Sequence, residues 1–209
     1  MVEIKQMPYS EKHDKVVNSK ELVESVTATF VQRHLGEEAV AQLRDVWRQG
    51  VKPMAVGASS EEKYESAYSN WVWVSKCALA FVRERMREEG TEQLRRAQVD
   101  ALKQHNASPA LLFLGLIRAV APGAAFQMTA RQMAYQLQWL TPYTLSELTG
   151  DRAVLNIPRC KVLDYPDTEE LCTVACQGTY PIWVAEQFSL ALRFDRQDKS
   201  CTITLARFA

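Results

Sequence analysis

Apolar side chains recur at three- and four-residue spacing through the first half of the chain, and this spacing predicts amphipathic helices. The first apolar stripe comprises Leu22, Val23, Val26, Phe30 and Val31. Asn18 or Ser19 is a suitable cap at its start, and Gly36 is a suitable end. The same pattern predicts further helices over residues 36–50, 60–90, 91–106 and 108–123.

Three aromatic residues of the 60–90 segment fall on one helix face. Tyr64, Tyr68 and Trp71 follow one another at four- and three-residue spacing. We interpret this stripe as core packing, because apolar helical faces are normally buried. Cys77, in the apolar run that follows, belongs to the same core as a small hydrophobic side chain.

The second half of the chain changes from helical spacing to alternation. Met133, Tyr135, Leu137 and Trp139 are separated by single residues, which predicts a half-buried strand over 125–140. The remaining predicted elements are a turn or short helix at 141–151, strands at 153–160, 188–195 and 201–208, and a helix at 164–178.

Helices followed by strands predict an α+β protein, in which the helical half packs on an antiparallel sheet that carries further helices. Residues 1–17 are charged and aperiodic, so we expect a flexible tail there. Residues 18–209 are expected to form a single domain. Its helical half covers 18–122, and its sheet-containing half covers 123–209.

Composition limits the partners and the location. The 209 residues include 25 basic and 25 acidic side chains, so we expect no nucleic-acid partner. No apolar run predicts a membrane span, and the first residues lack the apolar core of a secretion signal. We therefore expect a cytoplasmic protein with free thiols and a small molecule as its partner. Pairing of the apolar helices between two copies would give a homodimer.

Four of the five cysteines lie near the C-terminus, at Cys160, Cys172, Cys176 and Cys201. Cys172 and Cys176 are one turn apart on a predicted helix. Their spacing leaves three interpretations open. The thiolates would ligate zinc, although zinc knuckles ordinarily come as two close pairs. They would pack as small hydrophobic side chains. One of them would be a nucleophile, activated by a nearby cation or base.

The segments NIPRC, ELCTVACQGTYP, AEQF and DKSCTITL, within residues 150–208, resemble the C-terminal region of the L-2-amino-thiazoline-4-carboxylic acid hydrolase family. The matching positions are Arg159, Cys160, Cys172, Cys176, Glu186, Phe188 and Cys201. The family has an Asp three residues after the second helical cysteine, where this chain has Thr179. A more distant likeness, at the level of the fold, is to ligand-binding domains of the 4-vinyl reductase and TRAPP-like type.

The resemblance implies a hydrolase that opens a cyclic C–N bond of a thiazoline or amidine-type substrate through a cysteine, without a cofactor. Cys176 would be the nucleophile, Glu186 would shuttle protons, and Arg159 would bind the substrate carboxylate. The residues expected to line the substrate site are Cys160, Cys172, Thr179, Tyr180, Trp183, Tyr135 and Trp139.

Two alternatives to a hydrolase stay open. The first is a non-catalytic module that holds a small molecule or cofactor in an aromatic-lined pocket, and the missing Asp favours it. Its pocket would be lined by Trp71, Trp73, Tyr135, Trp139 and Trp183. The second is a zinc protein that uses Cys160, Cys172, Cys176 and Cys201 as ligands.

Overall fold

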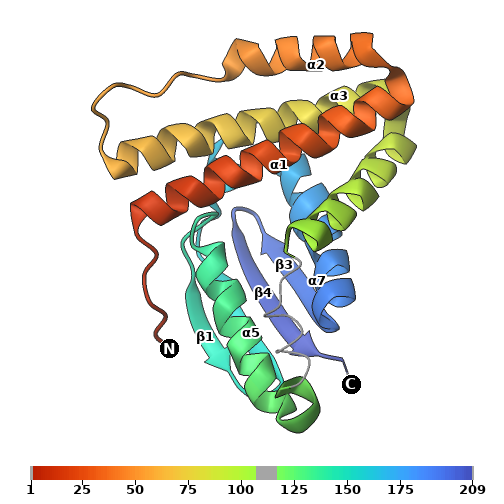
Figure 1. Ribbon diagram of the computed structural model, residues 1–209. Helices are drawn as coiled ribbons and strands as arrows, with labels where there is room; N and C mark the ends of the chain where they lie inside the picture. Colours follow the sequence, from red (N-terminus) through yellow and green to blue (C-terminus); the bar gives the residue numbers. More distant parts are fainter. Residues whose placement is uncertain (1, 107–116, 209) are drawn as a thin grey trace.

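The computed structural model describes residues 2–106 and 117–208, in which a helical layer lies over a four-stranded sheet (Figure 1). The layer contains α1 (Tyr9–Leu35), α2 (Glu37–Gly50) and α3 (Ser60–His105). Helix α1 runs beside α3, and α2 covers the side of this pair that faces away from the sheet. The expected α+β fold is therefore confirmed, with the helical half at the N-terminus.

Helix α1 begins at Tyr9, nine residues before the predicted start at Asn18. The Tyr9 ring packs on Tyr64 of α3, and Val16 is fully buried in the helical core. These turns contain many charged residues and few apolar ones, so their sequence lacks the apolar periodicity that would have predicted a helix. The prediction of a flexible tail over residues 1–17 is therefore wrong from Tyr9 onward.

Helix α3 starts at a capping box, in which the Ser59 hydroxyl accepts from the Glu62 N–H and the Glu62 carboxylate accepts from the Ser59 N–H. The helix breaks at Arg87, whose φ of 60° lies in the left-handed region. This break replaces the boundary predicted at Gly90 and turns the second part of α3 toward the sheet (Figure 1).

The aromatic stripe of α3 is buried, as predicted. The exposed fractions are 4% for Tyr64, 0% for Tyr68 and 9% for Trp71. The Tyr64 hydroxyl donates to the Trp139 carbonyl, and the Tyr68 hydroxyl donates to the Leu140 carbonyl. These two bonds join α3 to the segment that leads into the sheet.

Residues 125–140 form most of helix α5 (Pro122–Leu137), so the strand predicted there is wrong. Pro122 favours the first helical turn, where its missing N–H costs nothing. The face turned to the sheet carries Phe126, Ala130 and Ala134 at four-residue spacing. The alternation that suggested a strand lies mostly on the other faces of the helix.

The sheet has the order β1-β2-β4-β3, and all of its pairs are antiparallel. Its strands are β1 (Thr144–Leu148), β2 (Arg152–Ile157), β3 (Leu190–Gln197) and β4 (Ser200–Arg207). The last three match the predicted strands. Strand β1 replaces the predicted turn or short helix, because its backbone pairs with β2 through a register shift between Leu145 and Glu147.

The link from β2 to β3 is helical. It contains η1 (Lys161–Asp164), α6 (Glu169–Leu171), the π-helix η2 (Cys172–Thr179) and α7 (Tyr180–Phe188). The helix predicted over 164–178 is thus confirmed in its second half. Of the apolar helix predicted over 108–123, residues 108–116 lie outside the described part, and 117–120 are helical.

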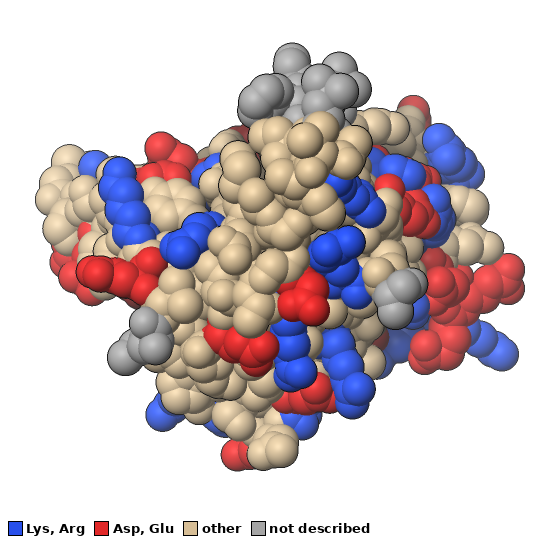
Figure 2. Space-filling model, turned by 90° about the horizontal axis from the view of Figure 1, so that it is seen from below, with Lys and Arg blue, Asp and Glu red and all other residues tan. Residues whose placement is uncertain are grey.

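Charges of both signs are intermingled on the face shown in Figure 2. This mixture agrees with 25 basic and 25 acidic residues in the chain. Within residues 2–106 and 117–208, no helix combines the length and apolar character that a membrane crossing requires.

Candidate functional site

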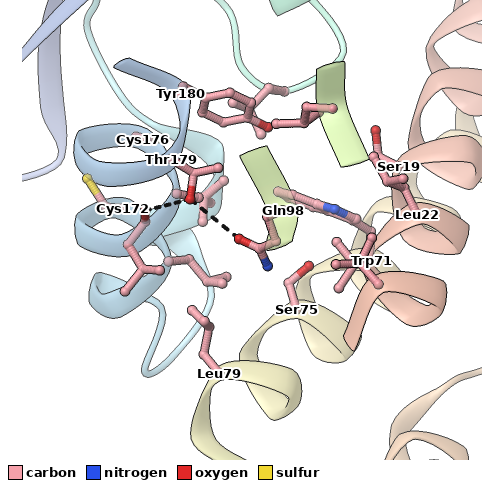
Figure 3. Close-up of a pocket in the computed structure, with 18 of the residues that line it drawn as sticks. Ser19, Leu22, Trp71, Ser75, Leu79, Gln98, Cys172, Cys176, Thr179 and Tyr180 are labelled. Carbon is pink, nitrogen blue, oxygen red and sulfur yellow. Dashed lines mark hydrogen bonds between the residues drawn. The ribbon is translucent and has the colours of Figure 1, made fainter. Parts of the chain in front are cut away.

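A cavity of about 110 Å³ lies between α1, the two parts of α3 and the π-helix η2 (Figure 3). Most of its wall is aliphatic. The aliphatic lining residues are Leu22, Val23, Val26, Leu79, Leu102, Leu140, Val162, Leu171, Val174 and Ala175. Trp71 and the thiol residues Cys160, Cys172 and Cys176 complete this surface, together with a few polar groups.

The π-helix places the two helical cysteines on the cavity wall. The Thr179 hydroxyl lies 3.0 Å from the Val174 carbonyl oxygen, five residues earlier, and supports the widened turn. Gly178 leaves room for the Arg95 side chain, since a Cβ at this position would lie 3.1 Å from Arg95 Nε. Single π-turns are rare and occur frequently at functional sites.

Cys172 and Cys176 lie one turn apart on η2, and each shifts the pKa of the other. A hydrogen bond from the Cys176 thiol, followed by the Arg196 guanidinium, lowers the pKa of Cys172 to about 6. The same contact with Cys172, together with burial, raises the pKa of Cys176 well above its ordinary value. The pair therefore loses its first proton at a lower pH than an ordinary cysteine and its second at a higher pH, and the causes favour Cys172 as the group that ionises first.

This assignment exchanges the roles that the sequence suggested. Cys176 was the expected nucleophile, yet among the described residues a cation lowers the pKa of Cys172 and none lowers that of Cys176. Arg196 lies on β3, opposite Cys201 of β4 in the strand register. The antiparallel hairpin thus brings a guanidinium to the helix from the sheet, which a scan of local sequence around the cysteines does not reveal.

The other two C-terminal cysteines lie close to this pair. The Cys160 N–H donates to the Lys199 carbonyl at 2.7 Å, which fixes Cys160 beside the β3–β4 hairpin. Burial raises the pKa of Cys160, and it raises that of Cys201 to about 11. All five cysteines are free. Among the described residues, no group of three or more His, Cys, Asp or Glu side chains is arranged to hold a metal ion.

Five polar residues line the cavity besides the thiols. Thr179 and Tyr180 were expected there from the sequence, whereas Ser19, Ser75 and Gln98 were not. Figure 3 shows Thr179 directed across the cavity toward Gln98, and the Thr179 hydroxyl lies 3.4 Å from Gln98 Oε1. A serine inside the apolar run WVWVSKCALAF is a signal that sequence reasoning could have used.

Glu186 and Arg159 lie outside the lining of the cavity. Glu186 is exposed on α7 and forms ion pairs with Arg96 and Lys103 of α3. These two cations lower the pKa of Glu186 to about 2. Arg159 is also exposed and pairs with Asp164 at 2.8 Å. Neither side chain is therefore placed for the role that the sequence suggested.

Of the aromatic residues expected in a pocket, Trp71 and Tyr180 line the cavity. The Tyr135 hydroxyl donates to Glu11, away from this region. Trp139 packs edge-on against Trp71, and Trp183 packs against Phe188. The Trp73 indole N–H donates to the Trp47 carbonyl. These four residues stabilise the walls or other parts of the core.

No protein-family model matches the sequence, and neither a curated protein nor a solved structure shows significant similarity to the chain. The resemblance to the thiazoline-carboxylate hydrolase family therefore stays a prediction, and the function is inferred from the cavity alone.

Proposed function

We propose that the protein is a cysteine-dependent hydrolase of small ring compounds, with Cys172 as its nucleophile. The observation that carries this proposal is the paired thiolate and thiol of Cys172 and Cys176 on the wall of the cavity. Thiolate is the reactive form of cysteine, and the Cys176 thiol and the Arg196 guanidinium both favour its formation at Cys172. A residue with a perturbed pKa in a cavity is a marker of a functional site.

The cavity favours a compact ring with little net negative charge. Its volume is about 110 Å³. A cavity of about 150 Å³ accommodates benzene, so a five-membered ring is close to the upper limit. No Lys or Arg of the described chain lines the cavity, so a substrate carboxylate would lack a partner there. An amidine-type ring without a carboxylate fits better than a thiazoline carboxylate.

The thiol pair supplies both a nucleophile and an acid. Cys172 Sγ bonds to the electrophilic ring carbon, the ring C–N bond breaks, and the departing nitrogen takes the Cys176 proton. Water then attacks the sulfur-bound carbon and gives a proton to the Cys176 thiolate. The carbon–sulfur bond breaks, which releases the product and restores the Cys172 thiolate.

The test uses 2-amino-2-thiazoline as the probe and mass spectrometry as the readout. We expect ring-opened product from the wild-type protein and a transient adduct that maps to Cys172. Cys172→Ser should abolish both, whereas Cys77→Ala, which removes a buried thiol outside the cavity lining, should leave them unchanged. An absence of product and adduct in the wild type, or their persistence in Cys172→Ser, would contradict the proposal.

A non-catalytic binding module is the second candidate. No Asp, Glu or His of the described chain lines the cavity, so no ordinary general base is present. Thr179, at the position of the family's Asp, is 3% exposed and shares its hydroxyl between Val174 and Gln98. Native mass spectrometry of the purified protein tests this candidate: a retained small molecule in a protein without turnover supports binding alone.

A further inference from the structure

Ser75 carries a hydroxyl that no other group in the described chain satisfies. The residue is 5% exposed and lies on the cavity wall contributed by α3. Its Oγ is buried and makes no hydrogen bond to any described residue. A buried polar group without a partner is unfavourable, and most such groups in proteins have one. Its position on a cavity wall suggests that the partner is a ligand.

Gln98 provides a second polar group in the same part of the cavity. It comes from the second part of α3, beyond the break at Arg87. Its Oε1 is 3.4 Å from the Thr179 hydroxyl, and its amide nitrogen is a further hydrogen-bond donor. In Figure 3 the Ser75 hydroxyl and the Gln98 amide point toward the same region, between Trp71 and Leu79 on α3 and the π-helix.

We infer that Ser75 and Gln98 form the polar recognition point of the cavity and bind a planar amide- or amidine-type edge of the ligand. A hydroxyl and a carboxamide both donate and accept hydrogen bonds, which matches an N–C–O or N–C–N edge. The aliphatic wall takes the apolar body of the ring. This inference rests on the proposed function only in treating the cavity as a ligand site, because it does not require the thiol chemistry.

The two polar groups also define what the cavity rejects. A ring of the same shape without a hydrogen-bonding edge would leave the buried Ser75 hydroxyl unpaired, and sites of this kind discriminate strongly against such analogues. A carboxylate would find hydrogen-bond donors but no cation. The substrate class is therefore a compact lactam or cyclic amidine whose polarity is concentrated on one edge.

The test compares three five-membered rings of similar size by ligand-observed NMR: 2-pyrrolidinone, cyclopentanone and methylcyclopentane. Each is measured with the wild-type protein, Ser75→Ala and the control Ser66→Ala, which changes a serine of the same helix outside the cavity lining. We expect the wild type and the control to bind 2-pyrrolidinone about tenfold or more tightly than methylcyclopentane, with cyclopentanone between them.

In Ser75→Ala that preference should fall at least severalfold. The melting temperature of the empty variant should rise, because the unpaired hydroxyl is removed; a purely structural role for Ser75 predicts a fall instead. Three results would overturn the inference: equal binding of the three rings by the wild type, no binding of any ring, or an unchanged preference in Ser75→Ala. Each would leave Ser75 as the site of a water molecule. The binding measurement is repeated with Cys172→Ser. Unchanged binding in this variant would show that ligand recognition does not need the thiolate, so that a failure of the proposed hydrolysis would not count against this inference.

Discussion

The helical stretch from Glu169 to Phe188 carries two kinds of ionisable group, the thiols of its first half and the Glu186 carboxylate near its end. Cys172 and Cys176 are among the residues that line the cavity. Glu186, less than three turns farther along, is exposed and held between two cations of α3. One short segment therefore presents one reactive group to the interior and another to solvent.

The difference follows from the cost of burying each group. A thiol can enter an apolar wall in its neutral form and needs only a local donor and one cation to ionise. A carboxylate is charged throughout the neutral range and is costly to bury unless it is paired. Glu186 therefore joins α7 to α3 through its ion pairs, whereas the two thiols carry the chemistry that we propose. The predictions below separate the two regions, and the largest expected effect comes first.

Replacement of Cys172 by Ser should have the largest effect on thiol reactivity. At pH 7 the modification of the variant by iodoacetamide should be slower on the order of 10- to 100-fold, because the remaining thiols are mostly protonated. The factor is not larger because a thiolate of low pKa, such as Cys172 in the wild type, is itself somewhat less nucleophilic. The measurement is the rate of mass increase. A rate equal to that of the wild type would show that another cysteine is the reactive one.

The effect of a substitution at Cys176 on the pKa of Cys172 should depend on whether the new side chain can donate a hydrogen bond. Cys176→Ala removes the principal cause of the lowered pKa of Cys172, so that pKa should rise toward its ordinary range. Cys176→Ser keeps a hydroxyl donor and should preserve much of the effect. The pH dependence of alkylation distinguishes the two variants, and identical profiles for them would show that the hydrogen bond has no influence.

Arg196→Gln should also raise the pKa of Cys172, because the guanidinium lowers that pKa through both a hydrogen bond and its charge. The matched control is Arg193→Gln, which removes an exposed cation from the same strand whose partner is Asp195. The control should leave the alkylation profile unchanged. An equal shift in the two variants would point to a general effect of net charge.

Glu186→Gln should leave the thiols unaffected and change only the stability at acidic pH. The pKa of Glu186 is lowered to about 2, so its ion pairs stabilise the native state above its ordinary pKa of 4.5. This contribution is lost as the pH falls from about 4.5 toward 2. Denaturation curves of the wild type and the variant should therefore converge in acid. A changed thiol profile in this variant would place Glu186 in the site after all.

The sequence predicted the fold where burial follows a regular period, and failed where tertiary contacts override it. The Tyr64, Tyr68 and Trp71 stripe is an example of success, because each side chain repeats on one face. Residues 125–140 are an example of failure. The buried face of α5 contains alanines, which pack closely on a sheet but are only weakly apolar. The alternation of larger apolar residues in the same segment was therefore the stronger pattern, and it predicted a strand.

The candidate site was predictable in its thiols but not in its partners. Cys160, Cys172 and Cys176 could be grouped from their position in the chain, and the structure places them on one cavity. Gln98 reaches the cavity from a distant part of α3, and Arg196 of β3 lies beside Cys172 without lining the cavity, so only the fold reveals these two partners. Arg159 and Glu186 were expected in the site from the family resemblance, whereas in the structure each forms an ion pair outside the cavity lining.

The most direct test of the central claim is a titration of thiolate ultraviolet absorbance in the wild type, Cys172→Ser and Cys176→Ser. We predict one thiolate that forms with a midpoint near pH 6 in the wild type, is lost in Cys172→Ser and is retained in Cys176→Ser. A wild type without thiolate below pH 8, or a transition that disappears with Cys176 rather than Cys172, would contradict the account.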